Sequence, residues 1–518
     1  MKQHIKFSLG FLVTLCLLFS CARPPQQVIE TSEGVSESGS TRDFTVIRME
    51  GEFGVASGFF VDQDKIATNI HVAAYPGVIF ARSPDQKTIW TVEGVTAFDM
   101  DNDLVILKVV GKDVPLPLGD SDTLQSGETV SVVGYPTGKY TVSGGTLHSI
   151  LDSNKWLQMN VKISPGNSGS PVINSKGQVI GIVSATEDPY SYAIPSNTLK
   201  ALLAESGPPE PLAQWRERGP IRSYVYSSQG TNNYSEGRYD EAIVAFDKVI
   251  KLNPEQADAY YNRGLSKFRL GDLEAEKGNT EKTRRLYESG IEDSTQAIKF
   301  IPEDVFAYHN RAGGKFRLAQ LEADIAKTQQ YYQDAIDDWT RVIKLNPELA
   351  DPYNNLGIAK VRLGETNADQ GDISAAQKLY VSAIEDCTHS IQLNPENPDP
   401  YINRGYAQFR LGKTKSDHGD IADGEVLYTA TVRDCTQAIQ LNPENAAAYG
   451  NLGVAKAALG NAEGAIEDFN TAIRLDPENA EYFYERGLAK EALEQKEAAK
   501  ADFEKAKELD PDVDKSLK

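Results

Sequence analysis

The pattern of apolar and polar residues divides the chain into two stretches. From about residue 43 to 205, short apolar segments such as Gly58–Asp62 and Val130–Gly134 alternate with turns rich in glycine, proline and asparagine. Many short strands at this spacing predict an all-β sandwich or barrel. Beyond a Pro-rich segment at 207–211, the apolar residues recur with the period of amphipathic helices. The sequence therefore predicts an all-β domain followed by an all-α domain.

The helical part is built from repeats. Seven units end in a proline that closes a short Leu-Asn-Pro-like signature, at spacings of 48, 45, 48, 48, 34 and 34 residues. In the unit that ends at Pro477, Gly453, Ala465, Phe469 and Ala472 occupy positions that resemble the small and aromatic sites of the tetratricopeptide repeat. The resemblance implies a solenoid of paired antiparallel helices, because small residues let the helices approach closely.

Units two to five carry about 14 additional residues. Divided as seven per helix, the insertion lengthens each helix by two turns and keeps the buried stripe nearly in phase. Gly278, Gly371 and Gly419 then mark the turns between helices. The alternative is a loop of 14 residues, which the helical appearance of segments such as 321–329 disfavours.

The N-terminus resembles a bacterial lipoprotein signal. Lys2 and Lys6 precede an apolar run of 13 residues, Phe7–Phe19, which is shorter than a membrane-spanning helix. The run ends in Leu-Phe-Ser-Cys, which resembles a lipobox and implies lipidation of Cys21. We expect a signal peptide at 1–20, a flexible tether at 21–42 and a lipid anchor in the cell envelope. Ala22 after the cysteine favours the outer membrane, facing the periplasm; ordinary secretory cleavage, giving a secreted or periplasmic protein, is the alternative.

The predicted organisation continues with a β domain at 43–205, a linker at 206–221 and a repeat array at 222–518. The net charge is −21, of which residues 41–207 contribute −6 and the C-terminal part −15. This balance argues against nucleic-acid binding, which needs clustered basic residues. Cys387 and Cys435 occupy the aromatic position of their repeats and are expected to be buried thiols; a disulfide between them is the alternative. No metal or cofactor is expected.

The segment Ser164–Pro171 carries the strongest catalytic signal of the β domain. Its Gly-Asn-Ser-Gly turn exposes Ser168, and the backbone N–H groups of Gly166, Asn167 and Ser168 are candidate oxyanion donors. A nucleophilic serine needs a base, and the domain contains only His71 and His148. A structural role is the default for a lone histidine, and His148, inside an expected strand, keeps it.

The base in turn needs a carboxylate to orient it. Asp99, Asp101 and Asp103 lie together, and only Asp103 adjoins the apolar run Leu104–Leu107, which favours its burial. Asp99 and Asp101 are expected to be solvated turn carboxylates.

These segments together resemble the chymotrypsin-fold peptidases of the Deg/HtrA type. The likeness rests on Ala56–Asp62, Thr68–His71, Asn102–Lys108 and Gly166–Gly169, and covers residues 43–203. It implies a double β-barrel with His71 as general base, Asp103 as its orienting acid and Ser168 as nucleophile. It also implies a substrate-binding region that includes Lys162, Ser184 and Ala193. A solvated surface position is the alternative for Lys162.

The resemblance implies a serine endopeptidase that acts through an acyl-enzyme, with protein or peptide substrates. Members of this family usually continue into a PDZ module, which the repeats replace here. We expect the concave face of the repeats to bind protein substrates or a protein partner, and the membrane to be contacted only through the lipid. A surface scaffold with a latent or inactive peptidase domain is the main alternative, and an esterase of the same fold is a further one.

Overall fold

The computed structural model describes residues 46–51, 54–151, 155–187, 189–511 and 513. The predicted signal peptide, the lipidation site at Cys21 and the tether lie outside the described residues. The chain forms two compact units, one ending at Pro254 and the other beginning at Glu255. Each unit is described separately.

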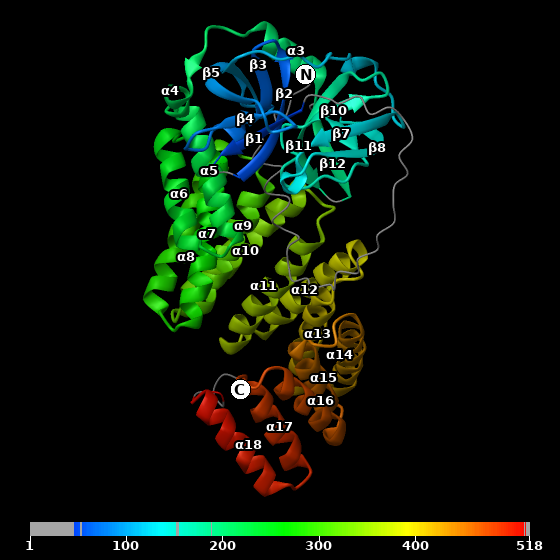
Figure 1. Cartoon of the computed structure of the whole chain (residues 1–518). Helices are drawn as coiled ribbons and strands as arrows, with labels where there is room; N and C mark the ends of the chain where they lie inside the picture. The colour runs from blue at the N-terminus through cyan, green and yellow to red at the C-terminus, as the bar shows by residue number, and fades with distance from the viewer. Residues whose placement is uncertain (1–45, 52–53, 152–154, 188, 512, 514–518) are drawn as a thin grey trace. The chain divides into compact units, whose positions relative to one another are not determined.

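The first unit begins with a closed β-barrel, which is blue in Figure 1. Its strands run in the order β5-β4-β1-β2-β3-β6, and pairing of β5 with β6 closes the barrel. Alternating apolar side chains such as Ile47, Met49, Phe60 and Leu107 fill its core. The strands are β1 (Val46–Gly51), β2 (Gly54–Asp62), β3 (Lys65–Asn69), β4 (Phe80–Arg82), β5 (Ile89–Asp99) and β6 (Leu104–Val110), with the short helix α2 (Ile70–Ala73) after β3.

A second closed barrel follows, with the strand order β10-β11-β12-β9-β8-β7. A core that includes Phe59 and Ile106 of the first barrel and Ile182 of the second joins the two barrels, and the helix α3 packs against it through Leu199. The two barrels confirm the predicted fold class. The elements are η1 (Ser121–Thr123), β7 (Thr129–Gly134), η2 (Pro136–Gly138), β8 (Thr141–Ile150), β9 (Leu157–Met159), β10 (Pro171–Asn174), β11 (Val179–Glu187), β12 (Tyr190–Pro195) and α3 (Ser196–Ala204).

The expectation of a linker at 206–221 is wrong. This segment forms the strand β13 (Glu210–Pro211), which pairs with β5, and the helix α4 (Leu212–Arg216). Trp215 and Ile221 are fully buried in the core of the first barrel. The run of prolines and glycine indicates turns, but the apolar side chains that follow it bind the segment to the barrel.

The first helical pair also belongs to the first unit. It consists of α5 (Gly219–Ser235) and α6 (Tyr239–Leu252), and Val225 of α5 joins the core of the first barrel. Gly230 on α5 faces Phe246 on α6 so closely that a Cβ at position 230 would lie 2.7 Å from the ring. The close approach expected from the repeat pattern therefore holds in this pair.

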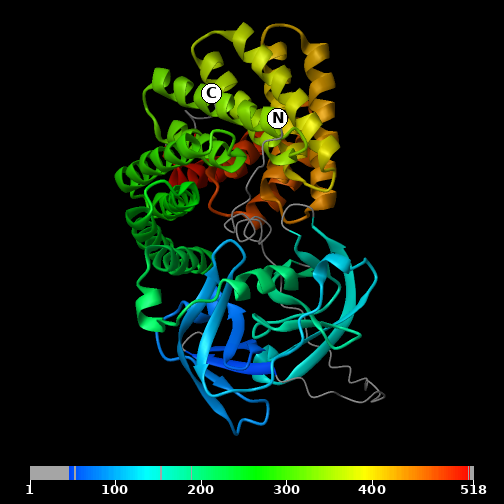
Figure 2. The ribbon, with the colours of Figure 1, turned by 90° about the horizontal axis from the view of Figure 1, so that it is seen from above.

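The second unit is a row of antiparallel helical pairs that curves from green through yellow to red in Figure 2. The four long pairs have helices of 17 to 21 residues, and the last two pairs have helices of 13 and 14. The helices are α7 (Ala257–Glu276), α8 (Thr280–Phe300), α9 (Val305–Leu321), α10 (Ile325–Leu345), α11 (Ala350–Asp369), α12 (Ile373–Leu393), α13 (Asp399–Asp417), α14 (Ile421–Leu441), α15 (Ala446–Ala458), α16 (Ala462–Leu475), α17 (Ala480–Ala492) and α18 (Lys496–Leu509).

The added residues therefore lengthen both helices of each long pair, as predicted. Gly278, Gly371 and Gly419 lie between paired helices with φ angles of 74°, 85° and 96°, which a glycine adopts without strain. In three long pairs, the first helix carries a second glycine seven residues after the glycine of the repeat pattern. This second glycine lies close to a tyrosine ring of the paired helix. These contacts are Gly271 with Tyr287, Gly364 with Tyr380, and Gly412 with Tyr428. Seven residues keep the added contact on the same helix face.

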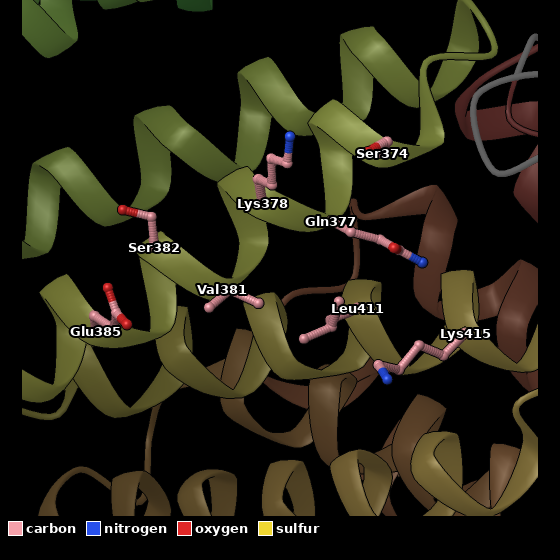
Figure 3. Close-up of a pocket in the computed structure, with 8 residues that line it drawn as sticks. All are labelled: Ser374, Gln377, Lys378, Val381, Ser382, Glu385, Leu411 and Lys415. Carbon is pink, nitrogen blue, oxygen red and sulfur yellow. The ribbon is translucent and has the colours of Figure 1, made fainter.

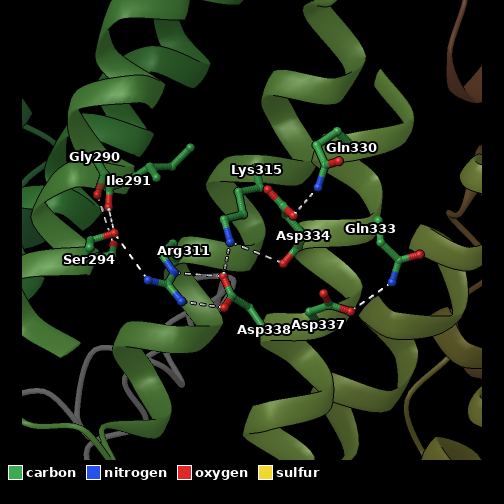
Figure 4. Close-up of polar contacts among 11 residues, drawn as sticks. Gly290, Ile291, Ser294, Arg311, Lys315, Gln330, Gln333, Asp334, Asp337 and Asp338 are labelled. Atoms are coloured by element: carbon green, nitrogen blue, oxygen red, sulfur yellow. Dashed lines mark hydrogen bonds and ion pairs between the residues drawn. The ribbon is translucent and has the colours of Figure 1, made fainter. Parts of the chain in front are cut away.

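Buried ion pairs also join the paired helices. Figure 4 shows Arg311 and Lys315 of α9 converging on Asp338 of α10, with N–O distances of 2.6 and 2.7 Å. The same Arg-Lys-Asp arrangement recurs in α7/α8 and α17/α18. Cys387 and Cys435 are both free and buried, which confirms the prediction of core thiols. Among the described residues, no helix combines the length and apolar character needed to cross a membrane.

Candidate active site

His71 and Asp103 form a close polar contact in the first barrel. His71 lies on α2, directly after β3, and its Nδ1 is 2.6 Å from Asp103 Oδ2. The main-chain N–H of His71 also donates to Asp103 Oδ1 at 3.1 Å. The Asp103 carbonyl in turn accepts from the backbone N–H of Ile70 and the side chain of Asn69, both at 3.1 Å. The imidazole and the carboxylate are therefore held together through both side chain and main chain.

The turn between β5 and β6 presents Asp103 to the histidine. Asp103 is 2% exposed and has a φ of 51°, a left-handed conformation that aspartate tolerates better than most residues. Asp99 accepts hydrogen bonds from the backbone N–H groups of Asp101 and Asn102, so it stabilises the turn as expected. Only the third carboxylate of this turn reaches the histidine.

The environment of His71 alters its pKa. Burial of the imidazole acts to lower the pKa, but the charge of Asp103 and the hydrogen bond to it raise the pKa above its ordinary value of 6.5. The Nδ1–H tautomer that donates to Asp103 leaves Nε2 free to accept a proton. This arrangement suits a general base.

Ser168 lies in the turn between β9 and β10, and the first barrel fixes this turn. The Ser57 N–H on β2 donates to the Ser168 carbonyl at 2.8 Å, and the Ser57 hydroxyl donates to the Gly166 carbonyl at 2.8 Å. Thr68, three residues before His71, donates to the Ser57 carbonyl at 2.8 Å. The strand that leads to the candidate base is thus connected to the loop of the candidate nucleophile.

The glycines of this loop permit its tight course. Gly166 and Gly169 have φ angles of 105° and 79°, and a Cβ on either would lie 2.2 Å from a carbonyl oxygen. The Asn167 N–H donates to the Ser164 carbonyl at 3.0 Å, so this group is engaged within the turn. The N–H groups of Gly166 and Ser168 donate to no acceptor among the described residues. Of the three predicted oxyanion donors, these two remain available.

The residues predicted to bind substrate differ in their surroundings. Ser184 lies at an irregularity of β11, and its hydroxyl is 3.4 Å from Asp103 Oδ2, so it also contacts the candidate triad. Lys162 is exposed. Ala193 is fully buried in the core of the second barrel, where its side chain packs inward. His148 is exposed and stacks on Tyr190 with ring centroids 4.5 Å apart, a contact that does not involve the candidate triad.

One further contact has no counterpart in the sequence patterns. Tyr224 on α5 donates its hydroxyl to Asp103 Oδ1 at 3.3 Å. The two residues are 121 positions apart, and Tyr224 belongs to a helix whose pattern predicts a repeat. No local signal links such a residue to a triad.

Comparison with known proteins finds matches in both parts of the chain. Residues 56–182 match the family described as trypsin-like peptidase domain. Residues 232–271 and 456–494 match a TPR repeat family, and residues 480–513 match a tetratricopeptide repeat family. The fold and the matches define a trypsin-like peptidase domain joined to tetratricopeptide repeats.

Individual proteins similar to the peptidase domain are described as serine proteases. A probable periplasmic serine endoprotease DegP-like of Hahella chejuensis is 40% identical over 135 residues, which cover 24% of this chain and 28% of that protein. A protein of the same description from Marinomonas sp. is 35% identical over 164 residues, covering 29% and 34%. The putative serine protease HhoB of Synechocystis sp. is 32% identical over 164 residues, covering 28% and 39%. The peptidase domain is thus similar to serine proteases described as DegP-like and HhoB, and the chain spans between 28% and 39% of these relatives' lengths.

Proposed function

We propose that the protein is a serine endopeptidase in which Ser168, His71 and Asp103 form the catalytic triad. The 2.6 Å contact of His71 Nδ1 with a buried carboxylate carries this proposal. A buried carboxylate in this position holds the imidazole in one tautomer and stabilises the imidazolium that forms during the reaction. The hydrogen bonds from Ser57 to the carbonyls of Gly166 and Ser168 support a fixed position for the nucleophile.

The proposed reaction begins with attack of Ser168 Oγ on the carbonyl carbon of the scissile peptide bond, while His71 Nε2 takes the hydroxyl proton. The N–H groups of Gly166 and Ser168 would donate to the oxyanion that forms. The C–N bond then breaks, and His71 returns the proton to the leaving amine. The product is an ester between the substrate's acyl group and Ser168.

Hydrolysis of this ester completes the cycle. His71 takes a proton from water, the hydroxide oxygen bonds to the acyl carbon, and the C–Oγ bond breaks as His71 protonates Ser168. No hydrogen bond joins Ser168 to His71 among the described residues. Such a contact is often long before substrate binds and shortens in the complex.

The repeats are proposed to recruit protein substrates or a protein partner through their concave face. A hollow between α12 and α13 of the second unit has a lining of suitable mixed chemistry (Figure 3). Val381 and Leu411 supply its apolar part, and Lys378, Glu385 and Lys415 supply charge. This combination suits a peptide segment with both apolar and charged side chains.

The scaffold alternative, with a latent or inactive peptidase domain, makes a different prediction. It requires the same binding surface but no reaction at Ser168. Reactivity of that one hydroxyl therefore separates the two functions.

We further propose that the protein resides in the bacterial envelope, anchored through a lipid on Cys21 and facing the periplasm. Two of the similar proteins are described as periplasmic, which supports the location. Replacement Cys21→Ala should remove incorporation of labelled fatty acid and release the protein from the membrane fraction. Equal membrane association of both proteins would contradict a lipid anchor at this residue.

A fluorophosphonate probe tests the nucleophile, since it phosphonylates only an activated serine. The wild-type protein should be labelled, and Ser168→Ala should not. Ser170→Ala is a matched control: Ser170 lies in the same loop, is fully buried, and its hydroxyl has no hydrogen-bond partner in the described part of the chain. It should be labelled like the wild type. Equal labelling of Ser168→Ala would contradict the triad, and no labelling of the wild type would favour the scaffold.

A further inference from the structure

The candidate catalytic carboxylate accepts hydrogen bonds from three separate parts of the first unit. Asp103 Oδ2 accepts from His71 Nδ1 and lies 3.4 Å from the Ser184 hydroxyl on β11. Oδ1 accepts the His71 main-chain N–H at 3.1 Å and the Tyr224 hydroxyl at 3.3 Å. Tyr224 is the one donor that comes from the helical region. Through this contact α5, the first helix of the repeats, reaches the carboxylate of the candidate triad.

The position of α5 is fixed by burial on both sides of Tyr224. Trp215 and Ile221 are fully buried in the first barrel before it, and Val225 joins the same core directly after it. The Trp215 ring packs edge-on against Phe98 with centroids 5.7 Å apart. Displacing the helix would expose these apolar side chains, which disfavours movement. Tyr224 is therefore presented from a rigid support.

Hydrogen bonds also attach α4 and α5 to the segment that carries His71. Arg216 donates to the carbonyl of Ala73 at 2.9 Å and to that of Gly77 at 2.7 Å. Tyr75 and Ser228 on α5 are joined by a hydrogen bond of 2.9 Å. The helix thus contacts the chain just after His71 as well as the carboxylate that orients His71.

The Tyr224 hydroxyl is in its donating form at neutral pH. Burial raises its pKa well above the ordinary value, and the charges of Asp103 and Tyr75 and the hydrogen bond to Asp103 raise it further. The titratable groups that face Asp103 are His71 from α2 and Tyr224 from α5. The hydroxyl therefore always presents its proton to the carboxylate.

We propose that Tyr224 is a positioning residue for the triad, whose hydroxyl holds Asp103 Oδ1 so that Oδ2 stays aligned with His71. This inference rests on the proposed function and extends the catalytic framework into the first repeat. The peptidase then requires α5 for full activity, whether or not the repeats hold a substrate.

Loss of the hydroxyl has two physical consequences. Oδ1 keeps only the His71 N–H as a donor, so the carboxylate is less firmly oriented. Its negative charge is also less dispersed, so it stabilises the His71 imidazolium more strongly and raises the pKa of His71. A residue that serves packing alone would produce neither effect, since phenylalanine keeps the ring.

The experiment uses the full chain with Tyr224→Phe and two matched controls on α5. Ser228→Ala removes a different hydrogen bond between α5 and the barrel. Tyr226→Phe removes the hydroxyl of another tyrosine on α5, one that lies beside Arg222 and not at Asp103. On a short peptide substrate, Tyr224→Phe should lower kcat by about 10- to 100-fold, within the size expected for loss of one hydrogen bond to a charged group. KM should change by less than about two-fold, because Tyr224 does not touch the substrate.

The pH profile supplies a readout that packing would not move. The acid limb of kcat/KM in Tyr224→Phe should move to higher pH by about 0.3 to 0.5 units. Both controls should keep the wild-type profile. The proposal is overturned if Tyr224→Phe matches the wild type in kcat and pH profile, or if Ser228→Ala reproduces its defects.

A measurement independent of turnover separates this inference from the proposed function. The His71 Nδ1 proton should give a downfield NMR signal, assigned by its loss in Asp103→Asn. Tyr224→Phe should shift this signal and Ser228→Ala should leave it in place, even if the wild type cleaves no substrate. An unshifted signal in Tyr224→Phe would overturn the positioning role.

Discussion

At the scale of residues, the His71–Asp103 pair controls when the proposed base is available. Only the neutral imidazole can accept the proton of Ser168, and the pKa of His71 lies above its ordinary value of 6.5 because Asp103 outweighs the effect of burial. The fraction of active protein should therefore rise with pH through a midpoint above 6.5. The buried carboxylate orients the imidazole of His71, but it also raises the pKa of His71 and so lowers activity at acidic pH.

We predict that Asp103→Asn changes both the rate and this midpoint. The kcat should fall by about 10⁴-fold, as expected when the imidazole loses its orienting carboxylate. The acid midpoint of the residual kcat/KM should fall below that of the wild type, since burial then acts without the opposing charge. A pH–rate series on both proteins measures the effect. An unchanged midpoint would contradict the assigned cause.

Buried charge also determines stability at single positions of the repeats. Asp338 is 5% exposed and receives both Arg311 and Lys315. Asp337, its neighbour, is exposed and accepts a hydrogen bond from Gln333. Figure 4 shows both residues on α10. Removing one partner of a buried ion pair leaves the others without compensation.

We predict that Asp338→Asn destabilises the α9/α10 pair by about 3 kcal/mol, whereas Asp337→Asn has almost no effect. Hydrogen exchange of peptides from α9 and α10 reports this local stability, since a multidomain chain does not unfold in two states. Equal protection in the two variants would contradict the role given to the ion pair.

The sequence predicted His71 and Asp103 as partners, and the structure contains their contact, because both residues lie in short motifs with local turn chemistry. The role of Ser168 stays a prediction. The sequence predicted three oxyanion donors, but the Asn167 N–H is consumed within the turn, which depends on the loop's φ angles. It missed Tyr224 because that contact depends on how α5 docks. Ala193 was expected at the substrate and faces the barrel core instead, since one residue of register reverses a strand side chain.

At the scale of elements, the segment from β13 to α5 completes the hydrophobic core of the first barrel. Glu210 and Pro211 extend the sheet beside β5, and Trp215 fills the core below it. The Pro-rich sequence predicted a linker because its proline and glycine residues indicate turns. Nothing in the local pattern indicates that Trp215 is buried. The long helices, in contrast, could be predicted because an insertion of two heptads preserves the buried face.

We predict that a chain ending at Ser206 is much less stable than one ending at Pro254. The shorter chain loses Trp215 and Ile221 from the core of the first barrel, and loss of a buried tryptophan alone costs about 3 to 5 kcal/mol. Thermal unfolding of the two chains measures the difference. Equal melting temperatures would show that the segment is dispensable for the barrel.

At the scale of the whole molecule, we propose that the first unit carries out the chemistry and that the second recruits the substrate. A chain ending at Pro254 should therefore cleave a short peptide at nearly the full-length rate, because it keeps the triad and Tyr224. Its cleavage of an unfolded protein should be slower, mainly through a higher KM. If both substrates are cleaved equally by both chains, the repeats do not recruit these substrates.

We propose that Ser168 cleaves peptide bonds. The most direct test is to incubate an unfolded protein such as casein with the full-length protein and identify new N-termini by mass spectrometry. The wild type should generate internal cleavages that accumulate with time, and Ser168→Ala should generate none. Absence of cleavage by the wild type, or the same cleavages with Ser168→Ala, would contradict the claim.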